Sequence, residues 1–184
     1  MNIAILSDIH DHIWNLDKVL EHCASADALI CCGDLCSPFI IKRLGDGFEK
    51  EIHLVFGNND ADLFRITRLA HPFGDRLHLY GEMGTFEIGG RSFALNHFPQ
   101  ISEAMAASGQ YDVVCYGHNH IRDIRKMVIG QQDILLINPG PVMGVKFEKG
   151  RPTPTEASFA LLETENMHAQ LWGCLPDQTL QPLS

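Results

Sequence analysis

The residues of this chain best suited to chemistry are histidines, aspartates and an asparagine that directly follow apolar runs. The clearest group is Gly117-His118-Asn119-His120, which follows an apolar stretch from Tyr111 to Tyr116. In an extended segment alternate residues point the same way, so we expect His118 and His120 to share one side. Two imidazoles placed in this way can bind one metal ion or two adjacent ions.

Further side chains able to bind metals follow four other apolar runs. They are Asp8 and His10 after the first run, Asp34 after the second, Asn58 after the third and His97 after a later one. Each also has a structural explanation, because aspartate caps helices, asparagine forms turns and a histidine can be a satisfied edge residue. Seven such residues at the ends of five predicted strands are more than capping alone explains, which favours a metal site.

The order of the predicted elements explains how these side chains can meet. Apolar runs at 2–7, 28–32 and 52–56 are each followed by a helical segment, at 13–24, 39–44 and 61–70. Three strand-helix units predict a parallel sheet, and ligands of such sheets lie outside the carboxyl ends of the strands.

The second half of the chain has the pattern of antiparallel ribbons. Hairpins are expected around Gly89-Gly90, Gly130 and Glu165-Asn166, with a helix over 101–108. Residues 148–155, with two prolines, are expected to be a surface loop, and the last ten residues to be frayed. We expect a single α/β domain over residues 1–184, with two sheets packed between helix layers.

Composition narrows the classes of partner. The formal charge is −9 with only 14 Lys and Arg, which argues against long nucleic acid, and no apolar run is long enough to span a membrane. The chain opens on Met1-Asn2-Ile3 without the pattern of a signal peptide, so we expect a cytoplasmic protein. Its six cysteines form no Cys-x-x-Cys pair; of these, Cys36 is the one placed to line the site.

Taken together, the motifs resemble those of the calcineurin-like metallophosphoesterases, most closely their small YfcE-type branch. The resemblance rests on the order Asp-x-His, Gly-Asp, Gly-Asn-x-Asp, a strand-end His and Gly-His-x-His, and it covers essentially the whole chain. It implies a four-layer αββα sandwich of two mixed sheets. It also implies two ions, the first held by Asp8, His10, Asp34 and His120 and the second by Asp34, Asn58, His97 and His118.

The implied activity is hydrolysis of small phosphodiesters by attack of a metal-bound hydroxide, with Asp34 bridging the ions. Four histidines and an amide favour Mn, Fe, Co, Ni or Zn over magnesium or calcium. Three alternatives stay open: a phosphomonoesterase, a non-catalytic scaffold like the retromer subunit that shares this fold, and a nuclease, which the acidic charge disfavours. A small phosphoester is the expected partner, and a homodimer is possible.

Two positions depart from the family pattern. Asn59 stands where many relatives have a histidine thought to protonate the leaving group. An amide can hydrogen-bond a phosphoryl oxygen but cannot act as a general acid, so a proton would come from water or from His12. Phe98 follows His97 where glycine is common, and either packs in the core or offers a stacking face to an aryl or nucleoside group. Asp60 is expected to hold its loop rather than to do chemistry.

Overall fold

Two mixed β-sheets form the centre of the structure, a computed structural model that describes residues 1–175 and 179–183. The larger sheet has seven strands in the order β14-β13-β12-β1-β2-β3-β4. Its parallel half comprises β1 (Asn2–Leu6), β2 (Ala28–Cys31), β3 (Glu51–Leu54) and β4 (Leu77–Leu79). Its antiparallel half comprises β12 (Ala157–Glu163), β13 (His168–Cys174) and β14 (Leu180–Pro182).

The smaller sheet has five strands in the order β5-β6-β7-β9-β8. These strands are β5 (Met83–Ile88), β6 (Arg91–Asn96), β7 (Val113–Cys115), β8 (Asp123–Ile129) and β9 (Gln132–Asn138). β6, β7 and β9 run parallel, while β5 and β8 pair antiparallel at the two edges. The three predicted hairpins are therefore confirmed, with turns at Gly89-Gly90, at Gly130 and at Glu165-Asn166.

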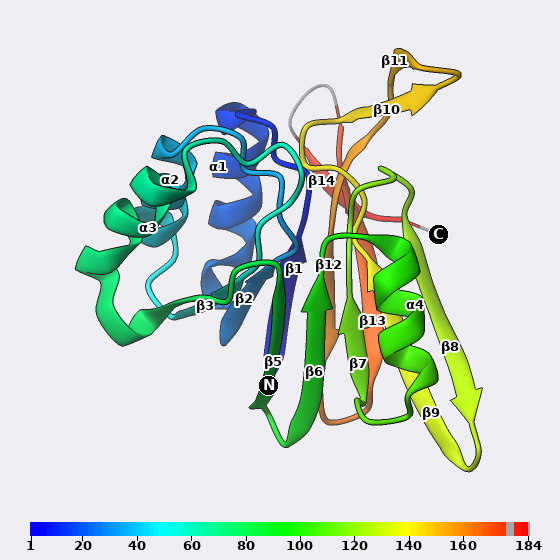
Figure 1. Cartoon of the computed structure of the whole chain (residues 1–184). Coiled ribbons are helices and arrows are strands. Elements are labelled where there is room, and N and C mark those ends of the chain that lie inside the picture. The colour runs from blue at the N-terminus through cyan, green and yellow to red at the C-terminus, as the bar shows by residue number, and fades with distance from the viewer. Residues whose placement is uncertain (176–178, 184) are drawn as a thin grey trace.

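Helices cover the outer face of each sheet (Figure 1). The seven-stranded sheet carries α1 (Ile13–His22), α2 (Phe39–Gly47) and α3 (Leu63–Ala70), and the five-stranded sheet carries α4 (Pro99–Ala107). Short 3-10 helices, η1 (Cys23–Ser25) and η2 (His71–Arg76), follow α1 and α3. The predicted four-layer sandwich is confirmed. Among the described residues, no helix is both long enough and apolar enough to cross a membrane.

The sequence of strand β1 is apolar without alternation because both faces of the strand are buried. Ala4 and Leu6 belong to the core beneath the helices, whereas Ile3 and Ile5 belong to the core between the two sheets. All four side chains are fully buried, as expected of a central strand covered on both faces.

Two expectations about the end of the chain are wrong. Residues 145–154 form a two-stranded ribbon of β10 (Val145–Glu148) and β11 (Arg151–Pro154) in place of a loop. The ribbon tolerates Pro152 and Pro154 because they are two residues apart on an edge strand, so both missing N–H groups lie on one side. Part of the segment expected to be frayed is β14, which pairs with β13, while residues 176–178 and 184 lie outside the described part of the chain.

Candidate metal centre

The loops that follow the strands are joined to one another by backbone hydrogen bonds. The amide of Asp8 donates to the carbonyl of Gly33 at 3.1 Å, and the amide of His10 donates to the carbonyl of Asp34 at 3.1 Å. Within the smaller sheet, the amide of Gly117 donates to the carbonyl of His97 at 3.1 Å, and the amide of Met143, after β9, donates to the carbonyl of Asp8 of the larger sheet at 3.0 Å. Backbone bonds therefore join the carboxyl ends of β1 and β2 in the larger sheet and of β6 and β7 in the smaller sheet, and the segment after β9 connects the two sheets.

Backbone strain is concentrated in these loops. Five of the seven candidate ligands have a positive φ, a conformation that L-residues rarely adopt; they are Asp8, His10, Asp34, His118 and His120. The expectation that His118 and His120 lie on an extended segment is wrong, since the chain turns there and both residues are left-handed, with φ of 73° and 57°. Strain of this kind persists where the surroundings hold the conformation, and it is common at functional sites.

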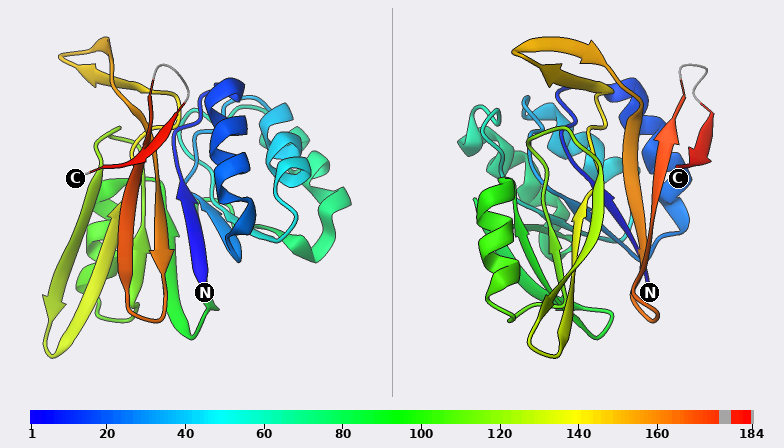
Figure 2. Two further views of the ribbon diagram at one scale, coloured as in Figure 1. Left: turned by 180° about the vertical axis from the view of Figure 1, so that it is seen from behind. Right: turned by 90° about the vertical axis from the view of Figure 1, so that its right-hand side faces the viewer.

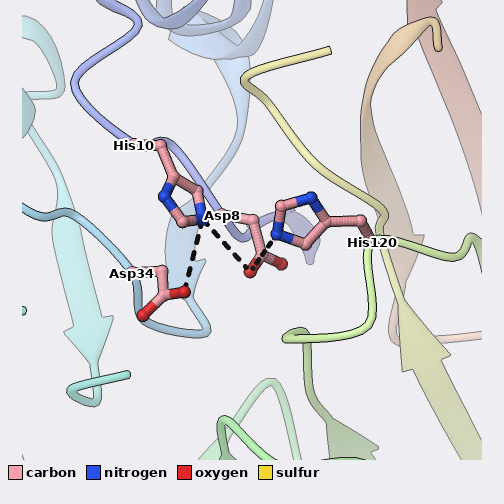
Figure 3. A group of neighbouring side chains, drawn as sticks. All are labelled: Asp8, His10, Asp34 and His120. Carbon is pink, nitrogen blue, oxygen red and sulfur yellow. Dashed lines mark ion pairs between the residues drawn. The ribbon is translucent and has the colours of Figure 1, made fainter. Parts of the chain in front are cut away.

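One group of side chains meets around Asp8 (Figure 3). The Nε2 atom of His120 lies 3.3 Å from Oδ1 of Asp8, and Nε2 of His10 lies 3.9 Å from the same oxygen. His10 Nε2 also lies 3.3 Å from Oδ2 of Asp34. The ligand atoms of these four residues all lie within 4.8 Å of one another, close enough to hold a single ion.

A second group meets on the other side of Asp34. Nε2 of His97 lies 3.4 Å from Oδ2 of Asp34 and 3.2 Å from Oδ1 of Asn58. Nδ1 of His118 lies 2.8 Å from the same Asn58 oxygen. Asp34 thus belongs to both groups, and all seven residues predicted from the sequence lie in one cluster.

The cluster fits divalent cations by its burial and by one unpartnered atom. The side chains of Asp8 and Asp34 are 0% and 1% exposed, and their ion-pair partners in the described part of the chain are all histidines. Nε2 of His10 is buried without a hydrogen-bond partner among the described residues. Buried carboxylates require a compensating positive charge, and the imidazole and oxygen donors gathered here suit transition metals.

A contact at Nδ1 of each of three imidazoles leaves Nε2 to face the carboxylates. Nδ1 of His97 donates to the carbonyl of Cys32 at 2.7 Å, and Nδ1 of His120 donates to the carbonyl of Val145 at 2.5 Å. Nδ1 of His10 lies 3.3 Å from Sγ of Cys36, so Cys36 contacts the site as the sequence suggested. In each ring Nε2 is left to face a carboxylate, an arrangement typical of metal-binding histidines.

The Asp34 carboxylate is held by Asn59, in the loop that follows β3. The backbone amide and side-chain amide of Asn59 donate to its two carboxylate oxygens, each at 2.8 Å. Burial raises the pKa of Asp34, but the adjacent imidazoles of His10 and His97 and the hydrogen bonds from Asn59 outweigh burial and keep the pKa well below its usual range.

The Asp60 carboxylate accepts hydrogen bonds from three backbone amides of the site loops, those of Asp34, Cys36 and Gly57. These bonds join the loop after β2 to the loop after β3. The loop-holding role expected of Asp60 is therefore confirmed.

Comparison with known proteins places this geometry in a family. The sequence profile described as the calcineurin-like phosphoesterase superfamily domain matches residues 1–167. The chain belongs to the calcineurin-like phosphoesterase superfamily. A curated relative, Phosphodiesterase MJ0936 of Methanocaldococcus jannaschii, is 31% identical over 169 residues, which cover 90% of this chain and 94% of the relative.

Solved structures agree with this assignment. A structure described as a novel archaeal phosphodiesterase has a TM-score of 0.80 and 29% identity, covering 94% of this chain and 99% of the other. YfcE, a phosphoesterase from E. coli, shares the fold with a TM-score of 0.65 and 21% identity, covering 100% of this chain and 98% of the other.

The structure also places the two residues whose roles the sequence left open. Phe98 is half-buried, and its ring lies against His97 and His118, with ring centroids 5.3 and 4.9 Å away, so it does not pack in the core, which was one of the two alternatives. Nδ1 of His12 accepts a hydrogen bond from the amide of Asn15 at 3.3 Å and so caps α1. His12 lines a hollow at the base of the ribbon, and none of the seven cluster residues lines that hollow.

Proposed function

We propose that this chain hydrolyses small phosphodiesters using two divalent transition-metal ions. The observation that carries the proposal is the arrangement of the seven side chains in two groups that share Asp34. The first ion would be held by Asp8, His10, Asp34 and His120, and the second by Asp34, Asn58, His97 and His118. The names of two relatives, both phosphodiesterases, support the choice of a diester.

Two ions at this site would activate a water molecule, neutralise the phosphate and stabilise the charge that develops on its oxygens. In the hydrolysis, a water oxygen forms a bond to phosphorus, the bond to one ester oxygen breaks, and the leaving alcohol takes up a proton. The protein's own contribution is to keep Asp34 ionised and in place through Asn59. The amide of Asn59 has a second N–H, which we assign to a phosphoryl oxygen of the substrate.

The presence of Asn59 in place of a histidine also favours diesters with good leaving groups over monoesters whose leaving groups need protonation. The seven candidate ligands include no general acid positioned for the leaving group, and Asn59 cannot supply a proton near neutral pH. Aryl leaving groups need little protonation, so aryl diesters should be good substrates. A scaffold role is disfavoured because all seven candidate ligands are present and converge on one site.

The test is the turnover of bis(p-nitrophenyl) phosphate against p-nitrophenyl phosphate in Mn²⁺ or Ni²⁺. We expect a preference for the diester and loss of both activities in Asp34→Ala. Asp75→Ala is a suitable control because Asp75 is an exposed aspartate outside the cluster. A clear preference for the monoester would replace the diesterase with the phosphomonoesterase alternative.

A further inference from the structure

The ribbon of β10 and β11 projects away from the two large sheets (Figure 2). Its two strands pair with each other and with neither large sheet. The chain that leads into it is attached to the site, because the amide of Met143 donates to the carbonyl of Asp8 at 3.0 Å. Its first residue, Val145, accepts the hydrogen bond from His120. The base of the ribbon is therefore part of the metal centre, while its tip extends beyond it.

An exposed aromatic ring on the ribbon faces the site. Phe147 is 56% exposed, and its ring centroid lies 5.6 Å from that of His120 at an interplanar angle of 64°. Phe98 lies in the same way against His118, with centroids 4.9 Å apart at 60°. His120 belongs to the first ligand group and His118 to the second, so each group has one aromatic ring beside it. An aromatic face left open to solvent next to a reaction centre is suited to a planar substrate group.

The ribbon is basic although the whole chain is acidic. It carries Lys146, Lys149 and Arg151 against the single acid Glu148, while the chain as a whole has a charge of −9. Lys146 pairs with Glu148 at 2.7 Å. Lys149 and Arg151 are exposed, and no ion pair within the described ranges includes either of them. The tip of the ribbon therefore carries free positive charge beyond the metal centre, which suits a substrate that extends along the ribbon and has further anionic groups.

We propose that the ribbon, together with Phe98, forms a subsite for a nucleotide-like phosphodiester. The inference rests on the proposed function and specifies its substrate class. The scissile phosphate lies at the metal centre, a nucleobase stacks on Phe147 or Phe98, and a further phosphate of a longer substrate reaches Lys149 and Arg151 at the tip of the ribbon. A short oligonucleotide has both the base and the second phosphate, a cyclic mononucleotide has the base alone, and an alkyl diester has neither.

A comparison of two chromogenic diesters that have the same leaving group tests this subsite separately from the metal centre. Thymidine 5′-(p-nitrophenyl phosphate) and methyl p-nitrophenyl phosphate both release p-nitrophenol and differ only in the other ester group. In the wild-type protein we expect a lower KM for the thymidine ester. Phe147→Ala should raise that KM about tenfold relative to the KM of the methyl ester, which corresponds to the loss of one base-aromatic stack. Phe147→Tyr should retain the preference because it keeps an aromatic face.

Val128→Ala is the control, since Val128 is an exposed apolar residue near the turn of the β8–β9 hairpin, outside the proposed subsite. A second readout is the affinity of the Mn²⁺-loaded protein for thymidine 5′-monophosphate, measured by calorimetry. Loss of that affinity in Phe147→Ala supports the subsite even if no diester is hydrolysed. In that case the proposed hydrolase function is wrong, but the nucleotide subsite is still supported.

Two results would overturn the subsite. The first is equal KM values and equal nucleotide affinity in wild type and Phe147→Ala. The second is a dimer that becomes monomeric in Phe147→Ala, by sedimentation, with unchanged discrimination between the esters, which would assign the ribbon to contact with a second copy.

Discussion

Gly57→Ala should disable the site by displacing Asp34. A Cβ atom at position 57 would lie 2.2 Å from Oδ1 of Asp34, 2.6 Å from its backbone nitrogen and 2.8 Å from its Cγ. Normal contact requires more than 3 Å, so the carboxylate must move by about 1 Å, and a change of rotamer alone cannot relieve the contact with the backbone. A misplacement of about 1 Å in a reacting group lowers the rate roughly 100-fold.

The assay is diester turnover together with metal content per chain, because a displaced Asp34 should weaken both groups of ligands. Gly130→Ala is the matched control; Gly130 lies in a hairpin turn with φ of 64°, and an added Cβ atom would meet no atom within 4 Å. That variant should lose about 1–2 kcal/mol of stability but keep its activity. Wild-type turnover and metal content in a folded Gly57→Ala protein would refute the close approach of Asp34 to this loop.

Three further predictions test individual residues. Asn59→His supplies a proton donor beside Asp34, so turnover of an alkyl diester should rise at least about tenfold relative to an aryl diester; equal changes for both would argue against general-acid catalysis. Cys36→Ala removes the contact behind His10 and should weaken apparent Mn²⁺ affinity about tenfold, while Cys36→Ser restores most of it. Burial, then the neighbouring His78, lowers the pKa of His53 from 6.5 to about 4. Because the unfolded state is protonated first, the free energy of unfolding should fall by about 3 kcal/mol as the pH drops from 7 to 4, and His53→Phe, measured by urea denaturation, should not show this fall.

The parallel half of the large sheet was predictable because its local signals agree. The apolar runs of β1, β2 and β3 are each followed by a polar turn and a helical periodicity, and the strands are buried on both faces. The candidate ligands were found for the same reason, since strand ends in a parallel sheet gather at one edge. The family motif then supplied the grouping of the ligands, which the spacing alone did not determine.

The features that were missed depend on tertiary contacts. β4 has only three residues, too few to show a period, and it forms by pairing with β3. The left-handed conformations of His118 and His120 are imposed by surrounding contacts, such as the bonds from the His118 amide to Asp8 and from His120 to Val145. The ribbon was hidden by Pro152 and Pro154, which are typical of loops, so the position of Phe147 beside His120 could not be inferred.

Metal content by mass spectrometry, paired with turnover of bis(p-nitrophenyl) phosphate, tests the central claim most directly. We predict about two transition-metal ions per chain, diester turnover, and the loss of turnover together with at least one ion in Asp34→Ala. Two bound ions with no turnover of either the aryl diester or the aryl monoester would contradict the hydrolase and favour the scaffold role.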